Sequence, residues 1–170
     1  MKVSQKVILI CFLSFTINNY SQETNKESIS KIGLDFPSFN LKDFKGVSFS
    51  QDVFKSNKIT IVDFWGTWCG PCRRAMPELQ ALYSKYNKQG LNIIGISVQD
   101  KPNKPKEFVD SKGFTYQFLE NGDELLKKLN IVTLPTIILV DNVGKIILIE
   151  KGLRKGSIEN IEKIIQKAIQ

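Results

Sequence analysis

The sequence contains no histidine and only three cysteines among its 170 residues. Without histidine the chain cannot form a Ser-His-Asp triad or a Cys-His nucleophile pair, and it has no imidazole to ligate zinc or haem. Three cysteines are also too few for a four-cysteine zinc site. We therefore expect no metal site and no cofactor, and the chemistry left to the chain is that of carboxylates, lysines and thiols.

Long basic tracts are also lacking, although the net charge is +7 at pH 7. Arg73–Arg74 is the clearest basic pair, and the other positive charges are spread along the chain. This pattern is typical of a solvated surface of mixed charge, so we expect no nucleic-acid partner. The length fits one domain behind a processed leader, with enough apolar residues to bury a core without extra crosslinks.

The N-terminus has the layout of a secretory signal peptide. Lys2 and Lys6 precede an apolar run over residues 7–17, and polar residues follow. The run is short for a membrane span. The alternatives are an uncleaved membrane anchor and a buried N-terminal helix or strand. We expect a signal peptide over residues 1–21, a polar linker over 22–32 and one domain over 33–170. The protein is then exported, to the periplasm or cell envelope.

Apolar periodicity and turn residues predict alternating strands and helices behind an N-terminal hairpin around Lys45–Gly46. Ser157 is the candidate N-cap of the last helix. Alternation of this kind predicts an α/β fold with a mainly parallel sheet that ends in an antiparallel hairpin. The predicted strands cover residues 58–65, 91–98, 115–119, 136–141 and 145–152, and the helices before the last one cover 71–89, 106–111 and 123–130.

The leader contains Cys11, so the exported domain keeps two cysteines, Cys69 and Cys72. A bridge this short constrains an unfolded chain little, so the pair suits chemistry better than stapling. An apolar strand delivers Cys69 to the start of a helix, where unpaired N–H groups and the helix dipole favour a thiolate. Cys72 lies one turn further on and can attack a mixed disulfide formed at Cys69.

The residues around the two cysteines support this interpretation. Gly70 gives the turn conformational freedom, and Pro71 begins the helix without an orphan N–H group. Arg73 and Arg74 add positive charge that supports a thiolate, or they are simply solvated helix residues. Two tryptophans flank the pair, and we expect Trp68 to contact substrate and Trp65 to pack in the core.

The stretch DFWGTWCGPC resembles the active site of the thioredoxin superfamily. The DFPSFNLKDFKG segment and the insert at residues 99–130 are similar to exported TlpA/ResA-type thioredoxins, which share the redoxin (AhpC/TSA-like) layout with peroxiredoxins. The resemblance implies a thioredoxin fold, with three α/β/α layers around a central mixed sheet, an N-terminal hairpin extension and a central insert. It also implies a redox-active Cys69–Cys72 disulfide.

The resemblance assigns further roles. Thr133, Leu134 and Pro135 match the loop whose cis proline faces the CxxC pair and offers backbone groups to the substrate; a trans proline at a strand start is the alternative. Asp63 matches the buried acid that exchanges a proton with the resolving cysteine, against a partly solvated Asp with a structural role. Ala75 stands where TlpA/ResA-type proteins carry a Glu, so Asp63 becomes the stronger candidate for the acid that exchanges this proton. Gly152 matches a glycine near the substrate groove, or is a simple turn residue.

These observations predict a thiol-disulfide oxidoreductase that reduces protein disulfides in an oxidising compartment and contributes to redox homeostasis there. A membrane thiol-electron carrier would recharge it, and we expect a monomer. Two alternatives stay open at this point, a peroxiredoxin-like peroxidase and a non-catalytic module that binds thiols or metal through the CxxC pair.

Overall fold

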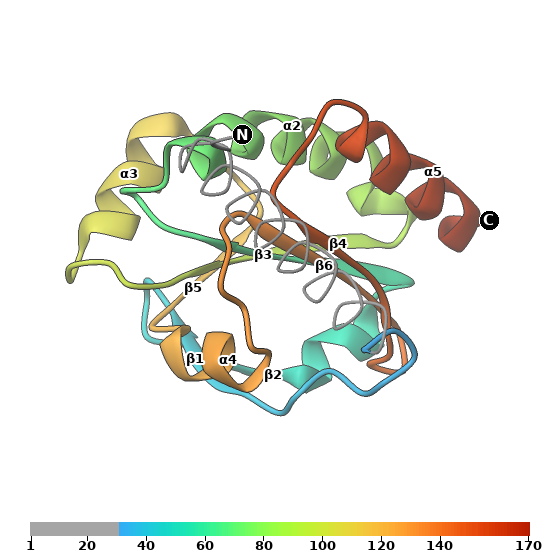
Figure 1. The fold of residues 1–170 in the computed structure, drawn as a ribbon, viewed down its shortest axis with the longest axis horizontal. Helices are drawn as coiled ribbons and strands as arrows, with labels where there is room; N and C mark the ends of the chain where they lie inside the picture. The colour runs from blue at the N-terminus through green and yellow to red at the C-terminus, as the bar shows by residue number, and fades with distance from the viewer. Residues whose placement is uncertain (1–30) are drawn as a thin grey trace, which may run out of the picture. The chain divides into compact units, whose positions relative to one another are not determined.

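The computed structural model of the chain describes residues 31–170 (Figure 1). The predicted signal peptide, Cys11 and most of the predicted linker lie outside the described residues. The helices and strands are β1 (Asn40–Asp43), β2 (Ser48–Ser50), the 3-10 helix η1 (Gln51–Ser56), β3 (Ile59–Trp65), α2 (Gly70–Tyr86), the 3-10 turn η2 (Asn87–Gln89), β4 (Leu91–Ser97), α3 (Lys104–Lys112), β5 (Gln117–Glu120), α4 (Asp123–Lys128), β6 (Thr136–Asp141), β7 (Ile146–Lys151) and α5 (Ser157–Ile169). Each predicted element is present, with ends displaced by three residues at most. The largest displacement is in the helix predicted to end at residue 89, where α2 ends at Tyr86 and the 3-10 turn η2 continues to Gln89.

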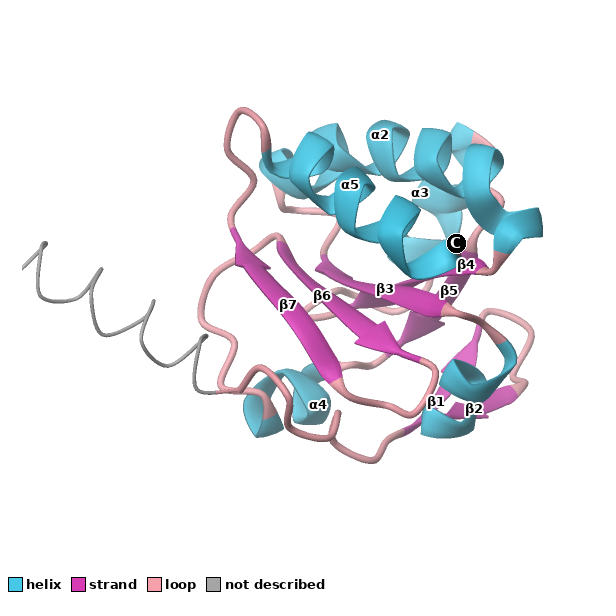
Figure 2. Ribbon diagram, turned by 90° about the vertical axis from the view of Figure 1, so that its right-hand side faces the viewer, coloured by secondary structure: helices cyan, strands magenta, loops and turns pink. Residues whose placement is uncertain are grey.

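The described strands form one seven-stranded sheet in the order β2-β1-β5-β4-β3-β6-β7. Helices α2, α3 and α5 cover one face, and α4 and η1 cover the other (Figure 2). Two apolar cores fill the spaces between these layers, and each takes alternate side chains of the central strand β3, which is buried along its whole length. The predicted three-layer α/β/α architecture, with its N-terminal hairpin, is confirmed.

The mainly parallel sheet predicted from the alternation of strands and helices is wrong, whereas the mixed sheet that the resemblance implies is confirmed. Only β3–β4 and β4–β5 pair in parallel, and the other four strand pairs within residues 31–170 are antiparallel. The cause is the connection from β5 to β6 over residues 121–135, which leaves the sheet where β5 ends and rejoins it at the same edge, where β3 ends. Strand β6 therefore enters at Thr136 opposite Phe64, at the edge where β3 ends, and runs back against it.

The N-cap predicted at Ser157 is also wrong. Gly156 holds the N-cap position in a left-handed conformation, and Ser157 is the first residue of α5. The Ser157 hydroxyl instead accepts a hydrogen bond from the backbone N–H of Arg154 and donates one to the Glu150 carboxylate. This serine therefore orders the loop between β7 and α5. The rest of α5 buries Ile161 and Ile165 as expected.

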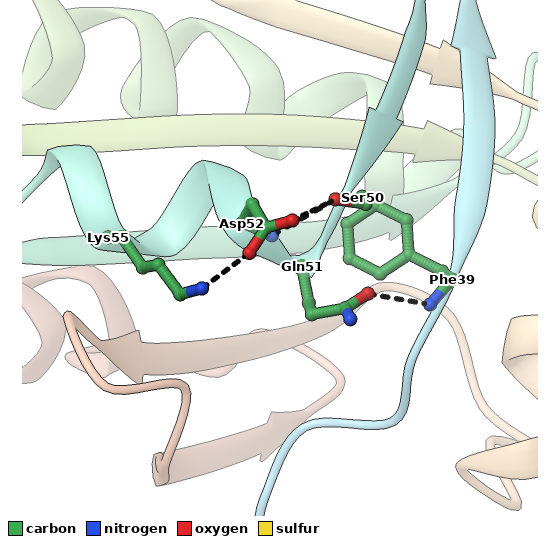
Figure 3. A network of polar contacts seen from close by, with 5 residues as sticks. All are labelled: Phe39, Ser50, Gln51, Asp52 and Lys55. Carbon is green, nitrogen blue, oxygen red and sulfur yellow. Dashed lines mark hydrogen bonds and ion pairs between the residues drawn. The ribbon is translucent and has the colours of Figure 1, made fainter.

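A polar network fixes the start of η1 beside the N-terminal hairpin (Figure 3). The Ser50 hydroxyl caps η1 by accepting a hydrogen bond from the Asp52 backbone N–H, and it donates one to the Asp52 carboxylate. Lys55 pairs with the same carboxylate at 2.6 Å, and these contacts lower the pKa of Asp52. The Gln51 side chain accepts a hydrogen bond from the backbone of Phe39. The network joins the hairpin to the layer on this face of the sheet.

The two outer strands of the sheet are protected differently. Strand β2 has only three residues. The start of β7 is lined by the chain's own residues 33–36: the Gly33 N–H donates to the carbonyl of Ile146, and the Ile146 N–H donates to the carbonyl of Leu34. Within residues 31–170, no helix has the length and apolar character that crossing a membrane requires.

Candidate active site

Cys69 and Cys72 form a disulfide at the N-terminus of α2. Strand β3 ends at Trp65, and a short turn, closed by a hydrogen bond from the Cys69 N–H to the Gly66 carbonyl, brings Cys69 to the N-cap position. The Cys69 sulfur accepts a hydrogen bond from the backbone N–H of Cys72 at 3.2 Å. A thiolate at this position would keep that donor and the positive end of a 17-residue helix.

The two sulfurs differ in their access to solvent. Cys69 is 5% exposed, whereas Cys72 is fully buried in the core under α2. Only Cys69 can therefore meet the disulfide of another protein without local unfolding. The geometry suits an attacking Cys69 and a resolving Cys72.

The two tryptophans occupy opposite environments. Trp65 is fully buried and packs against Phe108 and Phe118, in agreement with its predicted place in the core. Trp68 is 55% exposed beside Cys69. A Cβ atom on Gly66 would lie 2.6 Å from the Trp68 indole nitrogen, so glycine at this position lets the indole fold back over the turn.

The loop that carries Trp68 is tied to the end of the neighbouring strand. The Asp100 carboxylate accepts a hydrogen bond from the Thr67 backbone N–H at 2.7 Å and another from the Thr67 hydroxyl. Sequence analysis missed Asp100. The available signal was an acidic residue just beyond a buried parallel strand, at the edge where the neighbouring strand also ends.

The Leu134–Pro135 peptide bond is cis, so the alternative of a trans proline is wrong. Pro135 precedes β6 at the edge of the sheet where β3 ends. The same edge leads into residues 66–72, which we call the cysteine turn. Thr133 is exposed, Leu134 is half-buried and Pro135 is buried. The Pro135 carbonyl accepts a hydrogen bond from the N–H of Gly152 at 2.8 Å. Gly152, with φ of 67°, therefore belongs to the same surface as residues 133–135, which we call the proline loop.

Asp63 lies in the middle of β3 and is fully buried. The alternative of a partly solvated acid at a strand end is therefore wrong. Neither carboxyl oxygen has a hydrogen-bond partner within residues 31–170, and this dry position raises the pKa of Asp63 to about 7. Its neighbours on the same strand face, Ile61 and Trp65, belong to the core that contains Cys72. Asp63 thus lies in the same apolar layer as Cys72, with a carboxyl group that can change its protonation state near neutral pH.

Tyr116 is a second buried polar residue of this core, and sequence analysis did not single it out. Its hydroxyl has no hydrogen-bond partner within the described part of the chain, and burial together with the nearby charge of Asp63 raises its pKa well above the usual value. Gly95 pairs with Asp63 across the β3–β4 ladder, and a Cβ there would lie 2.8 Å from the Phe118 ring. The missing side chain of Gly95 thus gives the aromatic residues of the next strand room beside Asp63.

The basic and acidic residues after Cys72 also have distinct positions. Arg73 and Arg74 are exposed, and the Arg74 guanidinium reaches back to 3.6 Å from where a Cβ on Gly70 would lie. Ala75 is buried, so this position offers the cysteines no acid, and Glu78 is exposed further along α2. Within residues 31–170, no three Cys, His, Asp or Glu side chains gather to form a metal site.

A disulfide-forming CxxC pair mounted on this sheet, at the edge that also carries a cis-proline loop, defines a thioredoxin-fold thiol-disulfide oxidoreductase. The chain is an enzyme of that class, which sets aside the non-catalytic binding module. The AhpC/TSA family model matches residues 32–149, and the chain belongs to that family.

Individual relatives agree with this class. The chain is 32% identical over 167 residues to the thiol-disulfide oxidoreductase ResA of Bacillus cereus, covering 95% of this chain and 94% of that protein. The thioredoxin domain of a thiol-disulfide oxidoreductase from Bacteroides vulgatus superposes with a TM-score of 0.70 at 29% identity, covering 79% of this chain and 97% of the domain. A thiol:disulfide interchange protein from a Bacteroides species gives a TM-score of 0.68 at 30% identity, covering 79% and 90%. The predicted fold and activity class are confirmed.

Proposed function

We propose that this oxidoreductase reduces disulfides of exported proteins through a cycle of Cys69 and Cys72. The observation that carries the proposal is the unequal exposure of the two sulfurs at the start of α2. The predicted signal peptide over residues 1–21 supports export, to the periplasm or cell envelope, and the linker over 22–32 would separate it from the domain over 33–170.

The cycle begins with both cysteines reduced. The Cys69 thiolate attacks one sulfur of the substrate disulfide, and the other substrate sulfur leaves as a thiolate. Cys72 then loses its proton and attacks Cys69, which releases the second substrate thiolate. The substrate gains two electrons, and the enzyme is left with the Cys69–Cys72 disulfide.

Asp63 is the proposed acceptor of the Cys72 proton. Its pKa of about 7 lets it change protonation state near neutral pH, and no partner within residues 31–170 competes for its oxygens. The sequence has no histidine, and the buried Ala75 occupies the position of the TlpA/ResA-type Glu, so neither a histidine nor that Glu can take the proton.

The proposed substrate surface combines the cysteine turn with the proline loop. Trp68, Gly70 and Pro71 contribute from the turn, and Thr133, Leu134 and Pro135 contribute from the loop. Trp68, Pro71 and Thr133 are exposed, as contact with another protein requires.

Reduction of the Cys69–Cys72 disulfide back to the dithiol needs two electrons from another molecule. We propose that a thiol-electron carrier in the membrane supplies these electrons. The enzyme is proposed to act as a monomer.

The redox potential of the Cys69–Cys72 pair tests the direction. Gly70 and Pro71 match the dipeptide of thioredoxin, whose potential is about −270 mV, and a similar value is expected from equilibration with glutathione. A value near the −120 mV or so of DsbA would overturn the reductase assignment. Peroxide consumption at the rate of a dedicated peroxidase would instead favour the peroxidase alternative.

A further inference from the structure

A cleft of about 360 Å³ lies beside the active-site disulfide, between the first turns of α2 and the loop that joins β7 to α5. Pro71, two residues after Cys69, borders it on the α2 side, and Leu153 and Gly156 border it on the loop side. The cleft is therefore next to the surface on which the proposed function places the substrate.

Three cationic side chains line this cleft: Arg74, Arg154 and Lys155. None of them forms an ion pair with a carboxylate within residues 31–170. Two acids, Glu78 and Glu159, also border the cleft, so the cations outnumber the acids there. Arg74 extends toward Gly70, which brings its charge to the turn between the two cysteines.

The N-termini of two helices add to this positive field. The cleft touches the first turns of both α2 and α5, which lie side by side on one face of the sheet (Figure 2). The first turn of a helix presents unpaired N–H groups and the positive end of the helix dipole. Residues 70–73 of α2 include no acid, whereas Glu159 offsets part of the field of α5.

The loop side of the cleft is held in place and connected to the proline loop. The Gly152 N–H donates to the Pro135 carbonyl at 2.8 Å, and the Arg154 N–H donates to the Ser157 hydroxyl at 3.0 Å. A substrate segment that lies along Pro135 would therefore pass close to Arg154 and Lys155. A pre-ordered loop loses little entropy when it binds a charged group.

The opposite flank of the site has the reverse charge. A cavity of about 210 Å³ at the carboxyl ends of β4 and β5 is lined by Asp100, Glu120 and Asp123, with Lys101 as its cation. Asp100 is bonded to Thr67, next to Trp68, so this acidic cavity also adjoins the cysteine turn. An acidic substrate segment is repelled on this side and attracted on the other.

We propose that the cleft between α2 and the β7–α5 loop is a carboxylate-binding subsite that selects protein disulfides with acidic residues nearby. This inference rests on the proposed reductase function and deepens it. Glutamate or aspartate side chains of the substrate would pair with Arg74, Arg154 and Lys155 while Cys69 attacks the disulfide. The subsite also orients the substrate, because only one flank of the turn accepts negative charge.

The test compares two synthetic peptides that each contain one disulfide and differ only in two glutamates, replaced by glutamines, beside the second cysteine. At about 0.01 M salt we expect the reduced enzyme to act on the glutamate peptide with a kcat/KM about fivefold higher, as one or two exposed ion pairs would give. At about 1 M salt the Debye length falls to about 3 Å, and the ratio should approach one.

The variant Arg154→Gln/Lys155→Gln should lose this preference. The control Lys163→Gln/Lys167→Gln removes the same charge from exposed positions further along α5, outside the cleft, and should keep it. Equal rates for the two peptides, or an unchanged ratio in the cleft variant, would overturn the subsite. Equal loss in the control would assign the preference to net charge instead. If the wild type reduces neither peptide, the reductase function itself is wrong.

Discussion

The Asp100 carboxylate accepts two hydrogen bonds from Thr67, one from its backbone N–H and one from its hydroxyl. Thr67 lies two residues before Cys69, and Asp100 lies beyond the end of β4. The contact joins the cysteine turn to the rigid sheet across 33 residues of sequence. Hydrogen bonds to a charged acceptor are stronger than neutral ones, so this pair holds the turn in position.

Replacing Asp100 by alanine should therefore destabilise the oxidised protein by about 2 kcal/mol, because the Thr67 donors lose a charged partner. Urea unfolding measures this change. Asp110→Ala is the matched control, since Asp110 is exposed and pairs with Lys106 on the same helix. That variant should lose less than about 1 kcal/mol. Equal losses in the two variants would mean that the Asp100 contact is no stronger than a surface ion pair.

The unequal exposure of the two sulfurs predicts an asymmetric trapping result. In Cys72→Ser the mixed disulfide at Cys69 cannot be resolved, so substrates should accumulate as covalent complexes on a non-reducing gel and disappear with dithiothreitol. In Cys69→Ser the remaining thiol is fully buried and should trap almost nothing. Comparable trapping by both variants would show that the roles of attacking and resolving cysteine are wrongly assigned.

Asp63 predicts an unusual dependence of stability on pH. Its folded pKa is about 7 against an ordinary 3.8, so between these values the folded protein holds a proton that the unfolded chain has released. Rising pH therefore favours unfolding across this window, and the free energy of unfolding should fall by up to about 4 kcal/mol. Above pH 7 the dependence on Asp63 ends, because both states have lost the proton.

Urea unfolding of the oxidised protein between pH 5 and 8 covers the upper part of this window and should show a fall of about 2.7 kcal/mol, which Asp63→Asn should abolish. The comparison is clean, because the disulfide-bonded cysteines do not titrate and the sequence has no histidine. The acids with lowered pKa values, such as Glu124 and Glu162, lose their contribution below pH 4.5 rather than in this window. A fall of the same size in Asp63→Asn would exclude Asp63 as its source.

Gly95 should be intolerant of even one methyl group. A Cβ on Gly95 would lie 2.8 Å from the Phe118 ring and 3.2 Å from the Trp65 indole nitrogen, both in the buried core. Gly95→Ala should therefore cost about 1–3 kcal/mol of unfolding free energy. The double variant Gly95→Ala/Phe118→Leu should lose less than the sum of the two single changes, since a smaller side chain at position 118 relieves the clash. Strict additivity would contradict this account.

The parts of the molecule that were predictable from sequence are those with strong local signals. The apolar run ending at Trp65 indicates a buried strand, and Pro71 after Cys69 indicates a helix start, so the placement of the cysteines follows from neighbouring residues. The direction of β6 did not follow, because it depends on the edge of the sheet at which the β5–β6 connection ends, and local residue patterns do not mark that edge. Ser157 was misplaced because its hydroxyl bonds a loop N–H and Glu150 rather than capping the helix.

Three residues around the site escaped sequence analysis for one physical reason. Asp100, Tyr116 and Gly95 act on residues of β3 or the turn that follows it, through neighbours that the sheet brings together. Their residue types are common in loops and strands, and nothing in their local pattern marks them. Only the pairing of β3, β4 and β5 shows that they surround Asp63 and the cysteine turn.

The margins of the sheet matter for an enzyme that acts on the disulfides of other proteins. A long free strand edge can recruit an extended segment of another chain into intermolecular β-structure. Here β2 is short, and residues 33–36 already bond to the start of β7. An incoming chain therefore finds little backbone to extend at β2 and at the start of β7. These two places are thereby shielded from strand pairing with another protein.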